Sequence, residues 1–316
     1  MAIVCSPLDL IGNTPMVDVS ILSPNPRVKI YAKLEGQNPG GSVKDRIALN
    51  MIEAAERDGR LVPGSVLMEP SSGNTGIGLA LVCALKGYKL KIVMPTNVSP
   101  ERRQMLEAYD VDIIDSLGSE GSNGAVRMAQ RLAQENPEWV FLYQYGNPAN
   151  PAAHFNGTGP EIYKDCPEIT HFIAGLGTAG TLVGVGSYLK SVKPSVQIWA
   201  VEPPSGEMVD GLRNLDDGYI PEVFTDNNGF DILDRKKVVH PKESIEWTRR
   251  MVREAGVFAG ISSGAIMCAA AKCAEEIEEG VIVTIVCDGG WKYLSTGAYA
   301  GDIDEVTDRA KKIVYF

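Results

Sequence analysis

The pattern of apolar and polar positions changes period in a regular order along the first half of the chain. Short apolar runs rich in Val, Ile and Leu predict four strands, at residues 65–68, 89–94, 111–115 and 139–142. Between them, apolar residues recur every three or four positions, which predicts helices at 73–86, 101–109 and 123–135. Strands that alternate with helices are typical of a parallel sheet covered on both faces.

A second series of alternating elements follows in the C-terminal half. The same periods predict strands at 171–174, 197–201 and 281–286, and helices at 178–190, 244–255, 264–278 and 304–312. Residues 202–234 have no clear period and are predicted to be irregular. Near the N-terminus, residues 27–34 alternate and predict a strand with one solvent-facing side, which precedes a helix at 43–57.

The turn-rich segment 146–159 separates the two series, so we expect two α/β lobes, each with a mostly parallel sheet flanked by helices. Residues 37–150 are predicted to form the smaller, mobile lobe, and residues 1–36 and 151–316 the larger one. Ligands of such sheets bind outside the carboxyl ends of the strands. A site between the two lobes is therefore expected.

Composition and charge narrow the function classes. The 316 residues carry a formal net charge of −10 with no basic run, so neither nucleic acid nor an anionic membrane is an expected partner. No apolar run is long enough to cross a bilayer, and the first residues lack the basic region of a signal peptide, so we expect a cytoplasmic protein. The six cysteines form no C-x-x-C pair, which predicts reduced thiols and no metal site.

The glycine-rich turn 38–46 places Lys44 in the first turn of the predicted helix 43–57. The helix dipole disfavours an ammonium group there, so we expect a lowered pKa and a nucleophilic amine. Gly40 and Gly41 allow a close approach that a side chain would block. Such a lysine can hold an aldehyde as a Schiff base. A lone lysine in this place is more often simply solvated, so the interpretation depends on three further segments.

The first of these segments, 69–76, lies between a predicted strand and a predicted helix. Its consecutive backbone N–H groups, together with Ser71, Ser72 and Thr75, form a candidate nest for an anion at the positive end of the helix. The alternative is an ordinary loop whose serine caps the helix. The cluster has more donors than capping requires, which favours a site for a carboxylate.

The second segment, 175–181, satisfies G-x-G-x-x-G between a strand and a helix, and Glu202 follows at the end of the next strand. A nicotinamide-dependent dehydrogenase is therefore a serious alternative. Thr178 and Thr181 favour a single phosphate monoester over a pyrophosphate, and the dehydrogenase alternative leaves Lys44 without a role. In the third segment, 260–265, Ser262 opens a late helix, either as an ordinary cap or as a hydroxyl placed against a ring nitrogen.

Together, these four segments resemble those of cysteine synthase, a family of fold type II (tryptophan synthase β-like) pyridoxal-phosphate enzymes. Segments 11–15, 147–150 and 292–297 fit the same family, and the resemblance extends from about Leu10 to Gly301. It implies that the larger lobe binds pyridoxal 5′-phosphate and that the reaction is β-replacement. In that reaction an activated serine loses its leaving group and sulfur adds at Cβ.

The resemblance also implies roles for individual residues. Lys44 is the expected catalytic residue, which forms the Schiff base and then moves the Cα proton of the amino-acid substrate. The expected cofactor-binding residues are Lys44, Asn74, Gly177, Thr178, Ala179, Gly180, Thr181 and Ser262. The expected substrate-binding residues are Ser71, Ser72, Gly73, Thr75, Gln144 and Arg213.

Two segments resemble one branch of the family. Segment 208–214 resembles the branch that uses O-phosphoserine, in which the arginine matching Arg213 binds the substrate phosphate, so we expect O-phosphoserine to be preferred over O-acetylserine. The alternative is a surface arginine paired with Asp216 or Asp217. Segment 289–301 resembles the branch that takes sulfur from a ubiquitin-like carrier protein with a Gly-Gly thiocarboxylate. The apolar tail 311–316 is a candidate cover of the cleft, or it packs on the lobe surface.

The resemblance further implies a homodimer, for which Ile266 and Met267 are candidate contacts. Three other functions remain open at this point. The first is a conventional O-acetylserine sulfhydrylase that uses sulfide. The second is another fold type II enzyme, such as a cystathionine β-synthase or a threonine/serine dehydratase. The third is a binding role, in which the cleft holds the C-terminal peptide of a partner such as serine acetyltransferase.

Overall fold

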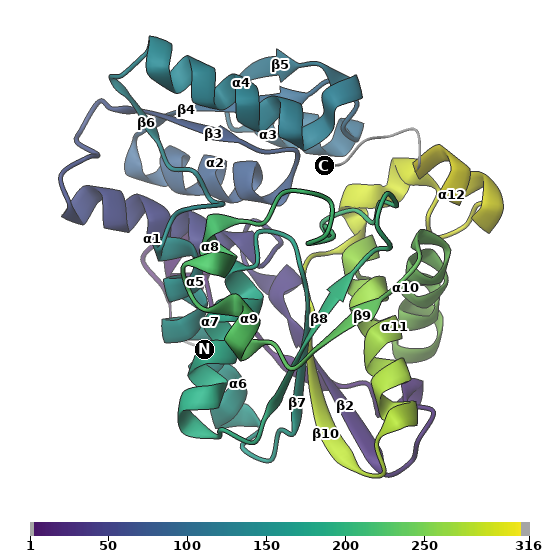
Figure 1. Ribbon diagram of the computed structural model, residues 1–316. Helices are drawn as coiled ribbons and strands as arrows, with labels where there is room; N and C mark the ends of the chain where they lie inside the picture. The colour runs from purple at the N-terminus through teal and green to yellow at the C-terminus, as the bar shows by residue number, and fades with distance from the viewer. Residues whose placement is uncertain (1–2, 311–316) are drawn as a thin grey trace.

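The computed structural model describes residues 3–310 and contains two sheets, one above the other in Figure 1. The upper sheet has four parallel strands in the order β5-β4-β3-β6: β3 (Val66–Pro70), β4 (Lys89–Pro95), β5 (Asp112–Ser116) and β6 (Trp139–Phe141). The lower sheet has the order β1-β2-β10-β7-β8-β9: β1 (Met16–Asp18), β2 (Val28–Leu34), β7 (His171–Gly175), β8 (Gln197–Glu202), β9 (Arg235–Val238) and β10 (Gly280–Val286). In the described chain, β1 and β2 form the one antiparallel pair.

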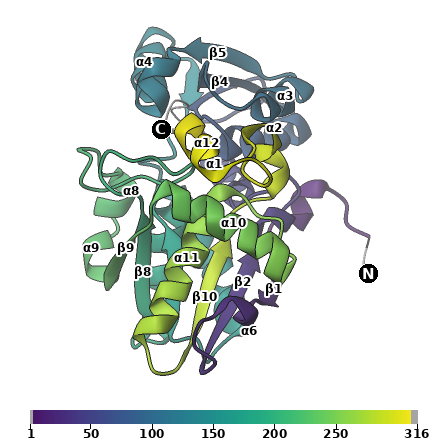
Figure 2. The same ribbon diagram turned by 90° about the vertical axis from the view of Figure 1, so that its right-hand side faces the viewer.

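Helices cover both faces of each sheet (Figures 1 and 2). Those around the upper sheet are α1 (Lys44–Arg57), α2 (Asn74–Lys86) and α3 (Pro100–Ala108) on one face and α4 (Gly121–Glu135) on the other. Those around the lower sheet are α6 (Gly159–Asp165) and α7 (Gly180–Val192) on one face and α10 (Pro241–Ala255) and α11 (Ile261–Glu276) on the other. The remaining α-helices are α5 (Ala149–Ala153), α8 (Glu222–Thr225), α9 (Gly229–Ile232) and α12 (Ile303–Ala310).

Both sheets are buried on their two faces because adjacent strand residues enter different cores. In β3, Leu67 packs in the cluster with α1 and α2, whereas Met68 packs in the cluster with α4. In β10, Ile282 and Val283 are divided in the same way between the α11 side and the α7 side. This arrangement confirms the predicted α/β fold with two mostly parallel sheets flanked by helices.

Two regions differ from the prediction. The segment 144–159, predicted to be a turn-rich loop, contains α5 and a π-helix, His154–Thr158, before α6. The prolines and glycines in it hid the helical period, but this helical stretch packs against α7 and α1. The irregular region contains α8 and α9 and leads into β9, whose sequence is almost wholly charged. This strand is held by pairing with β8, and Arg235 and Lys237 stack on Trp199.

The prediction that β2 has a solvent-facing side is wrong at Lys33, which is fully buried. The Lys33 ammonium lies 2.8 Å from Glu161 Oε2 and donates to Thr14 O at 2.6 Å. Arg46 joins this cluster, with Nε 2.7 Å from Glu35 Oε2 and Nη2 2.7 Å from Glu161 Oε2. Because Arg46 is on α1 and the other charged residues lie around the lower sheet, the cluster fixes α1 on that sheet.

Within residues 3–310, none of the helices combines the length and the apolar character that a membrane span requires. All six cysteines are free thiols. Ile266 and Met267, proposed as dimer contacts, lie in the core of the large sheet and are 0% and 1% exposed, so that expectation is wrong. The predicted tail, 311–316, lies outside the described residues. The predicted lobe boundary near residue 150 stays a prediction.

Candidate active site

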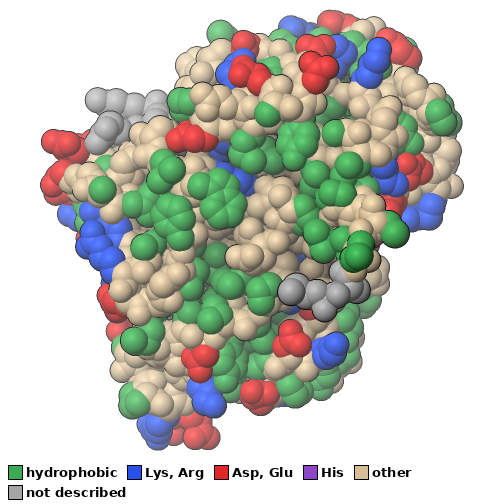
Figure 3. Space-filling view, turned by 180° about the vertical axis from the view of Figure 1, so that it is seen from behind, with side chains coloured by type: hydrophobic (Ala, Val, Ile, Leu, Met, Phe, Trp, Pro, Cys, Tyr) green, Lys and Arg blue, Asp and Glu red, His purple; other side chains and the backbone are tan. Residues whose placement is uncertain are grey.

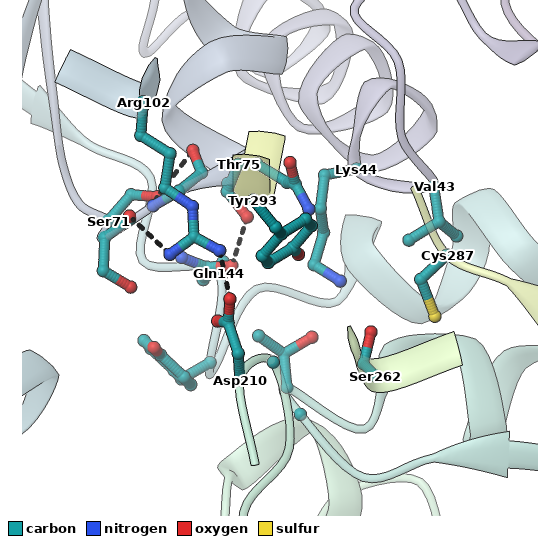
Figure 4. A pocket seen from close by; sticks show the side chains of 17 residues that line it. Val43, Lys44, Ser71, Thr75, Arg102, Gln144, Asp210, Ser262, Cys287 and Tyr293 are labelled. Carbon is teal, nitrogen blue, oxygen red and sulfur yellow. Dashed lines mark hydrogen bonds and ion pairs between the residues drawn. The ribbon is translucent and has the colours of Figure 1, made fainter. Parts of the chain in front are cut away.

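A pocket lies beyond the carboxyl ends of strands from both sheets (Figure 4). Its walls come from the turn before α1, from the loops after β3, β6, β7, β8 and β10, and from the first turns of α3 and α11. The lining residues are Val43, Lys44, Ser71, Ser72, Gly73, Asn74, Thr75, Arg102, Gln144, Tyr145, Gly177, Thr178, Asp210, Gly211, Ser262, Cys287 and Tyr293. Ten of the fourteen predicted site residues are in this set; Ala179, Gly180, Thr181 and Arg213 are not.

The loop before α1 holds Lys44 against the pocket. Ser42 Oγ accepts a hydrogen bond from Lys44 N at 3.1 Å, and Ser42 pairs with Asp288 in an isolated β-bridge. Gly41 has a φ of +80°, a conformation that other residues rarely adopt. Burial lowers the pKa of the Lys44 amine, and the nearby charge of Asp288 opposes that shift. The predicted direction is therefore found, but burial and not the helix dipole is its main cause.

Lys292 connects the same loop to Asn74. Its fully buried ammonium donates to Gly40 O at 3.2 Å, to Gly41 O at 3.1 Å and to Asn74 Oδ1 at 2.7 Å. The Asn74 amide nitrogen in turn donates to Asp288 Oδ2 at 2.8 Å. These contacts orient the Asn74 amide, and its second hydrogen remains for a ligand oxygen in the pocket.

The loop after β3 has the donors expected of a carboxylate site. Ser71 Oγ accepts from the backbone N–H groups of Gly73 at 3.2 Å and Gly76 at 3.0 Å, which shapes the loop at the start of α2. Thr75 Oγ1 donates to Gln144 Oε1 at 2.7 Å, so the loop and Gln144 form one wall. This wall meets the positive end of α2, where an anion is stabilised.

Glu69, which the sequence did not single out, supports that wall from behind. Its buried carboxylate accepts from the backbone N–H groups of Tyr143 at 2.7 Å and Gln144 at 3.0 Å. Burial raises the pKa of Glu69 to about 8, while the two backbone hydrogen bonds oppose the rise. The contacts fix the chain at Gln144, and so they position its side chain next to Thr75.

The turn between β7 and α7 forms a cradle. Ala179 has a φ of +67° and α7 begins at Gly180, so the backbone N–H groups of the first turn point out of the helix. A Cβ at Gly177 would lie 2.8 Å from Gly211 O, which explains the glycine. Thr178 Oγ1 accepts from Asn150 Nδ2 at 3.1 Å, and Thr181 Oγ1 lies 3.2 Å from His154 Nε2. Gly177 and Thr178 line the pocket, and the other three cradle residues do not.

Ser262 lines the pocket from the first turn of α11. It lies beside Cys287, another lining residue that the sequence did not indicate (Figure 4). Burial raises the pKa of the Cys287 thiol to about 11, so this cysteine is protonated at neutral pH and is not a nucleophile. Ser262 therefore faces the pocket as a neutral hydroxyl beside a neutral thiol.

The sequence also missed Arg102 and Asp210. The guanidinium of Arg102 forms an ion pair and a short hydrogen bond with Asp210, which comes from the irregular segment after β8. Arg102 carried one usable signal, because it lies in the first turn of a helix that follows a strand end. Asp210 carried none, since nothing in its segment predicts which way it folds.

Arg213 lies outside this pocket. It is 8% exposed, so the alternative of a surface arginine is wrong. Its guanidinium carbon is 5.2 Å from the ring centre of Tyr145 and 5.0 Å from that of Tyr219. It lines a second cavity on the same irregular segment. Tyr145, which does line the Lys44 pocket, lies between the two cavities.

The residues present fit pyridoxal phosphate. A lysine amine with a lowered pKa is available for an aldehyde, and a helix N-terminal cradle with Thr178 and Thr181 is available for a phosphate. The glycine at 177 leaves room that a side chain would fill. Asn74 and Ser262 supply neutral polar groups for the ring substituents.

Comparison with known proteins agrees with this fit. Residues 7–288 match the family described as pyridoxal-phosphate dependent enzyme. Cysteine synthase B of Pseudomonas aeruginosa is 42% identical over 292 residues, 92% of this chain and 96% of that protein. The crystal structure of O-ureido-L-serine synthase has a TM-score of 0.88 and 36% identity, covering 96% of this chain and 99% of that chain. O-acetylserine dependent cystathionine β-synthase of Helicobacter pylori has a TM-score of 0.88 and 34% identity, covering 95% and 100%.

These findings contradict the alternative of a nicotinamide-dependent dehydrogenase. The Glu202 carboxylate, expected on a ribose, is buried, lies 2.9 Å from Lys236 Nζ and accepts from Leu215 N at 3.2 Å. The family match extends over most of the chain and includes Lys44 and the cradle before α7. The chain therefore belongs to the pyridoxal-phosphate dependent enzymes, in the family that includes the cysteine synthases.

Proposed function

We propose that this enzyme is a cysteine synthase that performs β-replacement on an activated serine, preferring O-phosphoserine over O-acetylserine. The observation that carries the proposal is the joining, in one pocket, of the Lys44 amine, the donor loop 71–75 and the cradle before α7. An amino acid bound there has its carboxylate on the donor loop and its Cα near the lysine. The similarity to proteins named cysteine synthase supports the same reaction.

The chain's own residues divide the work. Bound pyridoxal phosphate supplies an aldehyde and an electron sink next to the substrate Cα. Because burial lowers the pKa of Lys44, its amine is more readily available as a neutral base that takes the Cα proton and returns it after sulfur has added. Ser71, Ser72, Thr75 and Gln144 bind the carboxylate and fix the substrate for that transfer. Ser262 offers a neutral partner to the ring nitrogen, which favours loss of a β-leaving group over transamination.

The preference for O-phosphoserine is supported by Arg213. A guanidinium forms a two-pronged contact with a phosphate dianion and gains little from a neutral acetyl ester. Arg213 is buried, and its guanidinium carbon lies 5.2 Å from the ring centre of Tyr145, a residue that lines the substrate pocket. The conventional alternative, a sulfide-dependent O-acetylserine sulfhydrylase, gives no reason for an arginine in this place.

A substrate panel tests the proposal. Holoenzyme with sulfide and either O-phosphoserine or O-acetylserine should form cysteine, with the higher kcat/KM for O-phosphoserine. Cysteine is measured with a thiol-specific reagent that resolves it from sulfide. A higher kcat/KM for O-acetylserine supports the conventional synthase. Cystathionine formed faster with homocysteine, or keto acid formed without a thiol, identifies another enzyme of the family.

We propose a ubiquitin-like carrier protein ending in a Gly-Gly thiocarboxylate as the sulfur donor, with sulfide as a substitute. A tail without side chains is the kind of peptide that can enter a narrow pocket between two sheets. In a single turnover, enzyme first loaded with O-phosphoserine should release cysteine faster with thiocarboxylated carrier than with equimolar sulfide. Equal or slower release with the carrier contradicts this donor. Sulfide activity alone decides nothing, because a small nucleophile needs no docking.

We propose a cytoplasmic homodimer. Figure 3 shows hydrophobic side chains gathered across the middle of one face of the molecule. Phe258, Trp291 and Leu294 are 41%, 44% and 59% exposed, more than apolar residues of this size need to be. Light scattering at micromolar concentration should give twice the mass of the 34.0 kDa chain. A monomer under those conditions contradicts the proposal.

A further inference from the structure

A buried ion pair crosses the pocket from one sheet to the other. Arg102 is on α3, which covers the upper sheet, and Asp210 follows β8 of the lower sheet. Their side chains are only 3% and 6% exposed, and Figure 4 shows the guanidinium reaching across to the carboxylate. Such a pair must offset a large loss of hydration, so its place beside the catalytic lysine calls for an explanation.

The pair dominates the charge of the pocket wall. Among the described residues that line the pocket, Lys44 and Arg102 are the basic ones and Asp210 is the acidic one. Under the proposed function Lys44 would hold the cofactor aldehyde, and Arg213 lines the second cavity. Arg102 is therefore the cation that an anionic group in the pocket meets first.

Arg102 is also next to the loop for the substrate carboxylate. Its Nη1 donates to Ser72 O at 3.5 Å, and a Cβ added at Gly73 would lie 3.3 Å from its Nε. Its guanidinium carbon is 5.1 Å from the ring centre of Tyr293, another residue that lines the pocket. In O-phosphoserine only a few covalent bonds separate the phosphate from the carboxylate. If the carboxylate binds to this loop, the phosphate therefore lies close to Arg102.

We propose that Arg102 is a specificity-determining residue that binds the phosphate of the substrate or the phosphate released from it, and that Asp210 occupies Arg102 until that anion arrives. The inference deepens the proposed function and rests on it for the identity of the substrate. A phosphate dianion outcompetes a carboxylate for a guanidinium because it has more charge and more acceptor oxygens. A neutral acetyl ester does not, and it leaves the Arg102–Asp210 pair closed.

The surroundings of Asp210 favour this exchange. Burial raises the pKa of its carboxyl, the charge of Asp288 raises it further, and Arg102 alone opposes the rise. When the guanidinium turns to a phosphate, Asp210 therefore takes up a proton more readily. A protonated carboxyl does not repel the incoming anion, which removes the main electrostatic cost of the exchange.

Binding of inorganic phosphate to the holoenzyme tests the proposal without depending on turnover. Titration calorimetry in phosphate-free buffer is done on Asp210→Asn, Arg102→Gln and the double variant. Arg103→Gln is the matched control, since Arg103 is the next residue of α3, is partly exposed, pairs with Asp115 and does not line the pocket. Circular dichroism and cofactor absorbance establish that each variant is folded and loaded.

Asp210→Asn should tighten phosphate binding about tenfold, because it frees the guanidinium, and Arg102→Gln should weaken it at least about tenfold. The double variant should bind as weakly as Arg102→Gln, and Arg103→Gln should bind like the unaltered enzyme. The double variant also removes the unpaired carboxylate, so it gives the answer if Arg102→Gln does not fold. In turnover, Arg102→Gln should raise KM for O-phosphoserine at least about tenfold more than KM for O-acetylserine.

An unchanged phosphate affinity in Asp210→Asn, or equal losses in Arg102→Gln and Arg103→Gln, overturns the inference and leaves the pair as a structural link. These experiments distinguish a failure of this inference from a failure of the proposed function. If Asp210→Asn tightens phosphate binding and Arg102→Gln weakens it, but O-phosphoserine is not a substrate, the anion site is supported and the proposed substrate is wrong. If O-phosphoserine is preferred but Arg102→Gln leaves the phosphate affinity unchanged, the proposed function is supported and this inference is wrong.

Discussion

Lys44→Ala should abolish cysteine formation, lowering the rate by at least about 10⁴-fold, while the protein stays folded. General acid–base catalysis by one side chain contributes about 10²–10⁴-fold, and this variant also loses the covalent hold on the cofactor. Lys44 points into a pocket and is held by the hydrogen bond from its backbone N–H to Ser42, which alanine keeps. Structural damage is therefore expected to be small.

Two measurements check the expectation. The unaltered protein should be yellow from bound pyridoxal phosphate, and the spectrum should change in Lys44→Ala, while circular dichroism and thermal unfolding stay the same. Lys242→Ala is a suitable control, since Lys242 is half exposed, pairs with Asp304 at 2.7 Å and does not line the pocket. It should keep both colour and activity. If Lys44→Ala still produces cysteine at the full rate, Lys44 is not the catalytic lysine.

The site residues that the sequence predicted share one property. Lys44, Asn74 and Thr178 all lie where a strand or loop passes into a helix, and glycine and hydroxyl residues mark such turns locally. The carboxyl ends of parallel strands then bring these turns together at one edge of each sheet. Local signals and one topological rule were therefore enough to find most of the pocket.

The residues that the sequence did not predict depend on partners far along the chain. Arg102 and Asp210 are 108 positions apart, and only the packing of one sheet over the other makes them meet. Glu69 lies in a strand, where its contacts to the backbone of Tyr143 and Gln144 leave no pattern in the sequence. The same holds for Lys33, because a charged residue in an alternating strand is normally exposed.

Arg213→Ala should reduce kcat/KM for O-phosphoserine by about 10- to 1000-fold, since one or two charge-assisted hydrogen bonds are lost, each worth about 1.5–3 kcal/mol. The loss for O-acetylserine should be far smaller, because its acetyl group carries no charge. Arg213 lines a neighbouring cavity and stacks on Tyr145, so we expect its guanidinium to reach the substrate phosphate only after a movement of this wall. Steady-state kinetics with both substrates and sulfide give the two ratios.

Two further variants make the test specific for the guanidinium. Arg213→Lys keeps the charge but loses the planar fork, so it should recover only part of the loss. Arg235→Ala removes another arginine stacked on an aromatic ring, 4.8 Å from the ring centre of Trp199, but on the exposed strand β9. Arg235→Ala should leave kcat/KM unchanged for both O-phosphoserine and O-acetylserine. Equal losses on O-phosphoserine and O-acetylserine in Arg213→Ala would show that the residue supports the irregular segment through its stacking on Tyr145 and Tyr219, and would refute a role in binding phosphate.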